Sequence, residues 1–310
     1  MKRCVAVIET AWEPDADTHL AMLEAALREA RTRGAELALL PELVFLPYFC
    51  QNPSREPFAW AEPLEGPSLE RLARWAKTFG LVIVTTIFER RTAGLYHNTA
   101  VVLETDGTLA GIYRKMHIPD DPGYFEKYYF TPGDLGFVPI ETSVGRLGVL
   151  VCWDQWFPEA ARLMALAGAH LLLYPTAIGW NPADPQSTRE QELDAWLTVQ
   201  RAHAIANGCP VVTANRCGFE ADSSGRTPGI QFWGHGFLSG PMGEYLIAPE
   251  HTQNRIAVAE VDDLAMERTR QAWPFLRDRR IEAYQNLLTR ARESPPGRIG
   301  PNFPKVPDSR

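Results

Sequence analysis

The sequence is poor in cysteine and in positive charge. It has five cysteines, an odd number, and no Cys-x-x-Cys pair, so neither a zinc site nor a disulfide framework is indicated. A reducing, cytoplasmic location fits this cysteine usage best. Lysine and arginine number 31 against 38 aspartates and glutamates, and the formal net charge is −7. Because no basic cluster is present, we do not expect nucleic acid as a partner.

Long apolar runs are also missing. No uninterrupted apolar stretch is long enough to cross a bilayer, so we expect no membrane partner. The first residues carry charges followed by a short apolar run, which is too short for a secretory signal. With 310 residues, 45% of them hydrophobic, the chain can bury a sizeable core. No break in composition is evident, which predicts one domain over residues 1–310, with 294–310 as a loose or partner-packed tail.

Short apolar runs alternate with segments of helical spacing along the chain. The short runs predict strands, and leucines three or four residues apart predict helices. The expected strands are 4–8, 37–40, 81–88, 96–103, 108–113, 147–151, 170–174, 210–214, 234–239, 244–247 and 255–261. The expected helices are 15–33, 68–79, 159–167 and 189–207, with a further helix through Leu288.

The stretch from Arg146 to Arg162 contains the most informative position. Residues 147–151 predict a buried strand, and a helix is expected to begin near Pro158, because proline suits a first helical turn. Cys152 begins the tight turn between them, so its thiol stands at the carboxyl end of a strand, where α/β proteins often build ligand sites. The nearby helix start favours the thiolate form. A free cysteine is also commonly a small core residue, and this alternative stays open here.

Two charged residues stand at the ends of other expected strands. Glu42 follows the strand 37–40 and lies within apolar sequence, where a carboxylate suits acid–base chemistry. Lys115 follows the strand 108–113. An exposed loop glutamate and a solvated lysine are the ordinary alternatives. The long aromatic stretch 120–133 is either functional or a cover for the core.

A carboxylate, an ammonium group and a thiol would converge if the three strands run in one sheet. Such a set suits attack on an amide-like carbon, because Glu42 can deprotonate Cys152 and later protonate the leaving nitrogen. Lys115 would hold the oxyanion together with the backbone N–H of Trp153. Removal of one such donor is expected to cost about 3 kcal/mol of barrier lowering.

Three segments of the chain, Leu40-Pro-Glu42, Tyr113-Arg-Lys115 and Val151-Cys152-Trp-Asp, together resemble the signature of the nitrilase superfamily, the carbon–nitrogen hydrolases. The resemblance covers almost the whole chain and implies an α/β fold, a four-layer α-β-β-α sandwich that pairs back to back in a homo-oligomer. It also implies a catalytic triad of Glu42, Lys115 and Cys152, assisted by Glu126, and no metal or organic cofactor.

Within the superfamily, segments 115–127, 130–134, 152–165 and 173–179 are most similar to those of the N-carbamoylputrescine amidases. This similarity implies hydrolysis of the ureido C–N bond of N-carbamoylputrescine to putrescine, CO2 and ammonia, a step of polyamine synthesis. Asp154 stands where true nitrilases usually carry glutamate, which counts modestly against a nitrile substrate. The segments 181–194 and 220–226 depart from the pattern and are expected to border the pocket mouth.

Several alternatives stay open on the sequence. Related hydrolases act on N-carbamoyl amino acids such as N-carbamoyl-β-alanine, on ω-amides or on aliphatic amides. A silent scaffold with this fold is disfavoured by the intact triad. A redox thiol protein built on Cys152 would need a resolving cysteine, and none is apparent nearby in the sequence.

The sequence offers candidates for a carbamoyl-amine pocket without ranking them. Tyr48, Tyr124 and Trp153 are expected as pocket walls, although core packing explains each nearly as well. Thr176 is a further candidate for substrate binding. A cationic substrate end needs an acidic partner, and the candidates are Asp120, Asp121, Asp154, Glu190 and Glu192.

Overall fold

The computed structural model describes residues 1–291. One compact unit spans Met1–Phe275, and a second unit begins at Leu276. The tail predicted at 294–310 lies outside the described residues. The single domain predicted over the whole chain therefore stays a prediction.

Within residues 1–291, the strands form two six-stranded sheets and one three-stranded sheet. The first sheet has the order β15 (Ile256–Asp262), β1 (Lys2–Ile8), β2 (Leu37–Leu39), β3 (Val82–Thr92), β4 (Leu95–Leu103) and β5 (Leu109–Arg114). The second has the order β14 (Tyr245–Ile247), β13 (Phe237–Ser239), β10 (Val211–Asn215), β8 (Leu171–Thr176), β7 (Gly145–Val149) and β6 (Ile140–Thr142). The third has the order β11 (Cys217–Glu220), β12 (Ile230–Trp233) and β9 (Gly179–Trp180).

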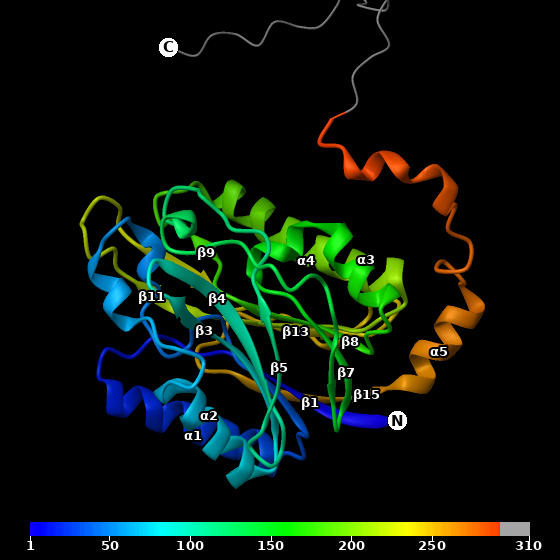
Figure 1. Ribbon diagram of the computed structural model, residues 1–310, viewed down its shortest axis with the longest axis horizontal. Helices are drawn as coiled ribbons and strands as arrows, with labels where there is room; N and C mark the ends of the chain where they lie inside the picture. Colours follow the sequence, from blue (N-terminus) through cyan, green and yellow to red (C-terminus); the bar gives the residue numbers. More distant parts are fainter. Residues whose placement is uncertain (292–310) are drawn as a thin grey trace, which may run out of the picture. The chain divides into compact units, whose positions relative to one another are not determined.

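The two large sheets lie face to face, with a pair of helices on the outer face of each (Figure 1). The helices α1 (Ala16–Thr32) and α2 (Pro67–Phe79) pack on the first sheet, and α3 (Pro158–Leu166) and α4 (Gln186–Asn207) pack on the second. This arrangement confirms the predicted four-layer α-β-β-α sandwich.

The pleat of the strands divides their side chains between two cores. In β1, Val5 and Val7 join the core between the sheets, whereas Ala6 and Ile8 join the core beneath α1 and α2. Successive side chains of a strand point to opposite faces, so a strand covered on both faces is apolar throughout. This burial explains why the inner strands appear in the sequence as continuous apolar runs.

Most expected elements occur within a few residues of their predicted bounds, but two expectations are wrong. Before Phe275, the last helix is α5 (Asp263–Ala272), and the predicted helix through Leu288 is replaced by short 3-10 turns at Ile281–Ala283 and Gln285–Leu288. The small third sheet was not predicted, because strands of two to four residues carry too little periodicity to be recognised.

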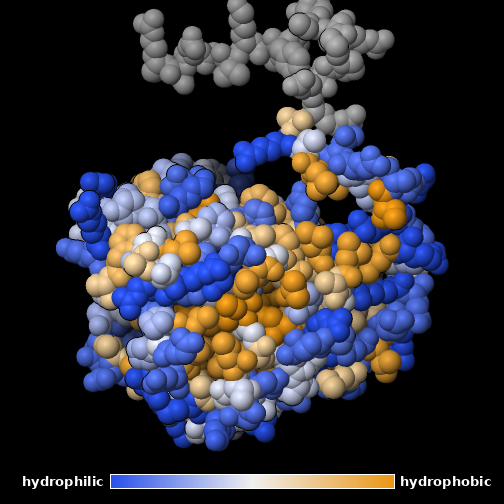
Figure 2. Space-filling view, in the orientation of Figure 1, coloured by the Kyte–Doolittle hydropathy of each residue, from blue (hydrophilic) through white to orange (hydrophobic). Residues whose placement is uncertain are grey.

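The described part of the chain contains no helix that is long and apolar enough to cross a membrane. Figure 2 shows that apolar residues gather over the middle of one face of the molecule, around β5. Exposed apolar side chains of the chain include Leu109 at the start of β5, and Leu135 and Val138 before β6. Apolar surface of this extent commonly marks contact with another molecule.

Candidate active site

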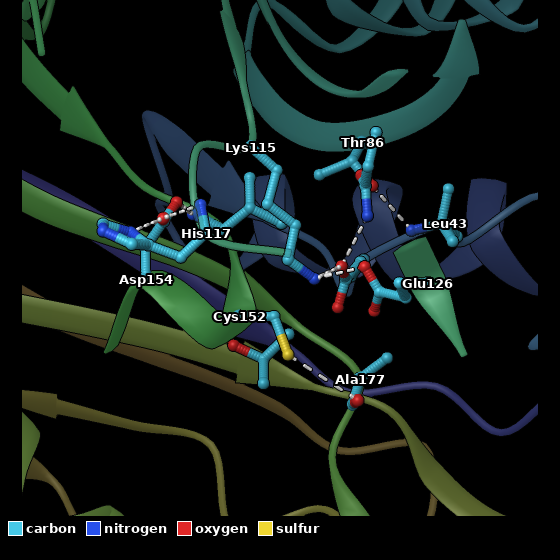
Figure 3. Close-up of polar contacts among 12 residues, drawn as sticks. Leu43, Thr86, Lys115, His117, Glu126, Cys152, Asp154 and Ala177 are labelled. Atoms are coloured by element: carbon cyan, nitrogen blue, oxygen red, sulfur yellow. Dashed lines mark hydrogen bonds and ion pairs between the residues drawn. The ribbon is translucent and has the colours of Figure 1, made fainter. Parts of the chain in front are cut away.

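The predicted carboxylate, ammonium group and thiol come from strand ends of two sheets. Glu42 follows β2 and Lys115 follows β5 in the first sheet, and Cys152 follows β7 in the second. One shared sheet was the condition considered from the sequence for their convergence, and the structure does not meet it. The side chains still meet, because the sheets lie face to face and these strands end at the same side (Figure 3).

Lys115 lies between two carboxylates in a buried cluster. Its Nζ atom lies 2.8 Å from Glu42 Oε1 and 2.7 Å from Glu126 Oε2, and none of the three side chains is exposed. Burial lowers the pKa of Lys115, but the two carboxylates outweigh this effect and hold the pKa well above its usual value. Burial raises the pKa of Glu126 to about 7, although the Lys115 charge opposes the shift. The cluster therefore combines a fixed positive charge with a carboxyl group that titrates near neutrality.

Glu42 keeps one carboxylate oxygen unengaged. Its Oε1 accepts hydrogen bonds from Lys115 and from Asn98 Nδ2, the latter at 2.6 Å. Its Oε2 is buried and has no hydrogen-bond partner within residues 1–291. A buried acceptor without a partner is rare in folded proteins, and next to a thiol it is a ready proton acceptor.

Cys152 lies within electrostatic reach of this cluster. It is 5% exposed, and its Sγ lies 3.7 Å from the carbonyl oxygen of Ala177 (Figure 3). Burial raises the pKa of the Cys152 thiol and the Glu42 charge raises it further, whereas Lys115 lowers it, and the net shift is well upward. The resting thiol is therefore protonated. A base must act before the sulfur can attack.

The backbone at Cys152 is held in a strained turn. Its φ of +44° lies in the left-handed region, which residues other than glycine rarely adopt. The residue opens the 3-10 turn Cys152–Trp156, and α3 begins at Pro158, as predicted. The turn places Cys152 at the end of β7, and Figure 3 shows its sulfur pointing towards the carbonyl oxygen of Ala177.

Asp154 braces this turn. Its carboxylate is fully buried and accepts hydrogen bonds from Val151 N at 2.9 Å, from the Tyr113 hydroxyl at 2.9 Å and from His117 N at 3.0 Å. His117 Nδ1 lies 2.6 Å from the same carboxylate. Both oxygens are thus engaged by the chain itself, which contradicts the predicted substrate contact of Asp154.

A cavity of about 560 Å³ lies near Cys152, although Cys152 itself is not among its lining residues in the described chain. Trp153 and Ile178 line it, and they are the chain neighbours of Cys152 and Ala177, which contact each other. Tyr124 forms another wall, and its hydroxyl donates a hydrogen bond to the carbonyl oxygen of Gly179 at 3.0 Å. Tyr124 and Trp153 thus lie at the positions that the sequence predicted for pocket walls.

The charged residues that line this cavity are all acidic. They are Asp121, Asp184 and Glu192, and no lysine or arginine occurs among its lining residues within the described chain. Burial raises the pKa of Glu192, and Asp184 raises it further. An acidic wall of this kind suits a ligand with a positively charged end.

Of the acidic candidates from the sequence, Asp121 and Glu192 line the cavity, whereas Asp120 and Glu190 are exposed outside its lining. Asp184 was not among the candidates. It lies in the segment 181–194, which was expected at the pocket mouth because it departs from the family pattern.

Two further predicted substrate contacts lie elsewhere. Thr176 is buried, and its hydroxyl is bonded to Gln155 Nε2 at 2.8 Å and to the Tyr174 carbonyl at 3.0 Å. Tyr48 is buried too, and its hydroxyl donates to Glu126 Oε1 at 2.8 Å. Neither lines the acidic cavity. The segment 220–226 does not line the acidic cavity either, and its residues Glu220, Ala221, Ser223 and Ser224 line a second cavity together with Tyr48.

The comparisons with known proteins agree with this geometry. The sequence model of the carbon–nitrogen hydrolase family matches residues 4–271, and the chain belongs to this family. It is a hydrolase that acts on carbon–nitrogen bonds.

Within this family, the chain is similar to hydrolases whose substrates are named. The N-carbamoylputrescine amidase of Solanum lycopersicum is 42% identical over 92% of this chain and 94% of its own length. The citrullinase of Francisella tularensis is 37% identical over 92% of this chain and 97% of its own length. The crystal structure of a carbon–nitrogen hydrolase from Helicobacter pylori superposes with a TM-score of 0.91 at 45% identity, covering 94% of this chain and 99% of that one.

Proposed function

We propose that this chain hydrolyses N-carbamoylputrescine to putrescine, carbon dioxide and ammonia. The observation that carries the proposal is the acidic cavity beside Cys152, because this substrate is an uncharged ureido group joined by a short alkyl chain to an ammonium group. With the ureido carbon at the thiol, the ammonium end would extend towards Asp121, Asp184 and Glu192. The similarity to plant N-carbamoylputrescine amidases supports this choice.

The same lining argues against the alternative substrates. N-carbamoyl amino acids and ω-amides of dicarboxylic acids carry a carboxylate, which three acidic side chains would repel, whereas citrulline carries an ammonium group beside its carboxylate. A plain aliphatic amide has no charge for the acidic wall to bind. The citrullinase relative makes citrulline the substrate to test beside N-carbamoylputrescine.

The reaction uses the proposed catalytic residues in order. Glu42 Oε2 takes the proton of the Cys152 thiol, and the sulfur adds to the ureido carbon. Lys115 Nζ and the backbone N–H of Trp153 stabilise the oxyanion. Collapse breaks a C–N bond, and Glu42 returns its proton to the leaving nitrogen. Glu126 then activates water to hydrolyse the thioester, and the released carbamic product decomposes to carbon dioxide and the second nitrogen base.

The test is a comparison of rates of ammonia release by the purified protein. We expect the highest kcat/KM for N-carbamoylputrescine, with citrulline, N-carbamoyl-β-alanine and butyramide at least tenfold lower. A higher kcat/KM for any of these three would overturn the substrate assignment. Cys152→Ser serves as the background control for each compound.

The proposal includes a homo-oligomer in a reducing, cytoplasmic location. Leu163 and Leu166 on α3 and Ile205 on α4 are exposed apolar side chains on neighbouring helices, which supports back-to-back pairing through this layer. The five free cysteines are consistent with the location. Light scattering during size-exclusion chromatography tests the oligomer, and a double change of Leu163 and Leu166 to glutamate should shift the mass towards that of one chain.

A further inference from the structure

Arg216 packs against the loop of residues 42–48, and its guanidinium donates five hydrogen bonds. Two of its hydrogen bonds go to Glu220 Oε1, at 2.8 and 2.6 Å. Three more go to the backbone carbonyl oxygens of Glu42, Leu43 and Leu46, at 3.2, 3.1 and 3.0 Å. A guanidinium has five N–H donors, so each of them has an acceptor.

Glu220 continues the contact to Tyr48. Its second oxygen, Oε2, accepts a hydrogen bond from Tyr48 N at 2.7 Å. The hydroxyl of Tyr48 in turn donates to Glu126 Oε1 at 2.8 Å. One Arg–Glu pair therefore holds the loop that bears Glu42 and, through Tyr48, also reaches the second carboxylate of the site.

The held loop is strained next to Glu42. Leu43 has a φ of +50°, which is unfavourable for a residue with a branched side chain. Its N–H donates to Thr86 Oγ1 at 2.8 Å, and its carbonyl accepts from Arg216 (Figure 3 shows Leu43 and Thr86). Strained backbone persists only where the surroundings over-determine it, and these bonds do so.

We propose that the buried pair Arg216–Glu220 is a positioning element of the active site. It fixes the main chain of Glu42 directly, and it fixes the carboxylate of Glu126 through Tyr48. This inference rests on the proposed roles of Glu42 and Glu126, but it does not depend on which carbon–nitrogen bond is hydrolysed.

Burial of the pair is costly unless its hydrogen bonds are complete. Arg216 is 2% exposed and Glu220 is 6% exposed. A buried ion pair is often no more stabilising than apolar residues of the same size, so stability alone does not account for it. Lysine has three donors in place of a rigid fork and cannot reach all of these acceptors. Arg216→Lys should therefore release part of the loop while keeping the charge.

The matched control is Arg3, another buried arginine in an acidic pair. It is 1% exposed and is bound to Asp263, where β1 meets α5. Both Arg216→Lys and Arg3→Lys remove a buried guanidinium, and both are expected to lower the midpoint of thermal unfolding. Only Arg216→Lys should lower kcat, by about 100-fold, with KM within about threefold of the unchanged protein.

A second measurement is independent of the substrate. The reagent is iodoacetamide, and mass spectrometry of the peptide that contains Cys152 gives the alkylation rate at this residue, because the chain has four other free cysteines. Because proton removal by Glu42 precedes attack by the sulfur, Arg216→Lys should slow alkylation about tenfold, whereas Arg3→Lys should not. Equal effects of the two substitutions on kcat and on alkylation would overturn the positioning role. If the unchanged protein does not hydrolyse N-carbamoylputrescine while the alkylation rates of Arg216→Lys and Arg3→Lys still differ, only the proposed substrate is wrong.

Tyr48→Phe covers the case in which Arg216→Lys does not fold. It removes one hydroxyl and keeps the ring packed against Tyr124 and Phe232. We expect kcat to fall about tenfold and the acidic limb of its pH profile to move to higher pH, because the lost hydrogen bond favoured the charged form of Glu126. An unchanged kcat and an unchanged acidic limb would refute the connection from Glu220 to Glu126.

Discussion

Lys115→Met tests the centre of the site. The substitution removes the positive charge between Glu42 and Glu126 while keeping a side chain of similar length. Breaking a buried ion pair by removing one partner costs about 3–5 kcal/mol, because the other charge is left unpaired. For a chain of this size, such a loss lowers Tm by about 6–20 °C.

The stability deficit should depend on pH with a definite sign. The pKa of Lys115 is raised in the folded state, so its stabilisation is fully present below its ordinary pKa of 10.5 and does not vary between pH 5 and 8. Without it, the pKa of Glu126 rises further, because the Lys115 charge opposes the shift caused by burial. Groups with raised folded pKa values stabilise the fold at low pH and lose that contribution as the pH rises through them. The deficit of Lys115→Met should therefore be larger at pH 8 than at pH 5.

The catalytic loss should exceed what instability explains. Removal of one oxyanion donor costs a factor of about 100–1000 in kcat. Ammonia release measured at 20 °C, well below Tm, separates the two effects. Lys77→Met, an exposed lysine on α2, is the control and should change neither quantity. A Lys115→Met protein that keeps a tenth of the original kcat/KM, or whose deficit shrinks from pH 5 to pH 8, would refute this account.

Four further outcomes follow from the same geometry. Cys152→Ser should reduce kcat by about a thousandfold or more in ammonia-release assays, while Tm stays the same. Glu192→Gln combined with Asp184→Asn should raise KM for N-carbamoylputrescine about tenfold and leave KM for the uncharged butylurea unchanged, since only the ammonium end meets these acids. Asp154→Asn should cost about 1–3 kcal/mol in chemical denaturation, because backbone donors would then face an amide NH2 group. Glu126, with its pKa raised to about 7, must be ionised to activate water for hydrolysis of the acyl-enzyme, so kcat should fall below about pH 7 in a buffer series.

The sequence predicted the reacting groups better than their surroundings. Glu42, Lys115 and Cys152 each follow an apolar strand, and strand ends are where a sheet presents side chains to a ligand. The sequence did not show that the three strands belong to two sheets, because parallel strands of two facing sheets give the same pattern of apolar runs. Strand order is decided by pairing between distant segments, which one sequence does not reveal.

Residues that act through long-range contacts could not be predicted. Arg216 meets the Glu42 carbonyl across 174 positions of the chain, and Asn98 meets the Glu42 carboxylate across 56. A buried polar residue within the apolar strand β4 was a usable signal for Asn98, but it does not name a partner. Asp154 shows the opposite error, since an aspartate beside a nucleophile can bind a substrate or brace the turn, and only the contacts distinguish the two.

The proposed proton transfer keeps the charge of the buried cluster constant. When the Cys152 proton moves to Glu42, a neutral thiol and a carboxylate become a thiolate and a neutral acid, and Lys115 remains the counter-charge beside both. Burial penalises a change of net charge far more than a transfer within the cluster. The raised pKa of the Cys152 thiol describes the loss of its proton to water. Transfer of the same proton to Glu42 within the cluster therefore has a lower energetic cost than the raised pKa implies. On this reasoning the pH dependence of the reaction reflects the ionisation of Glu126. Burial keeps the Cys152 thiol protonated until a substrate binds, and a protonated thiol is less easily oxidised than a thiolate.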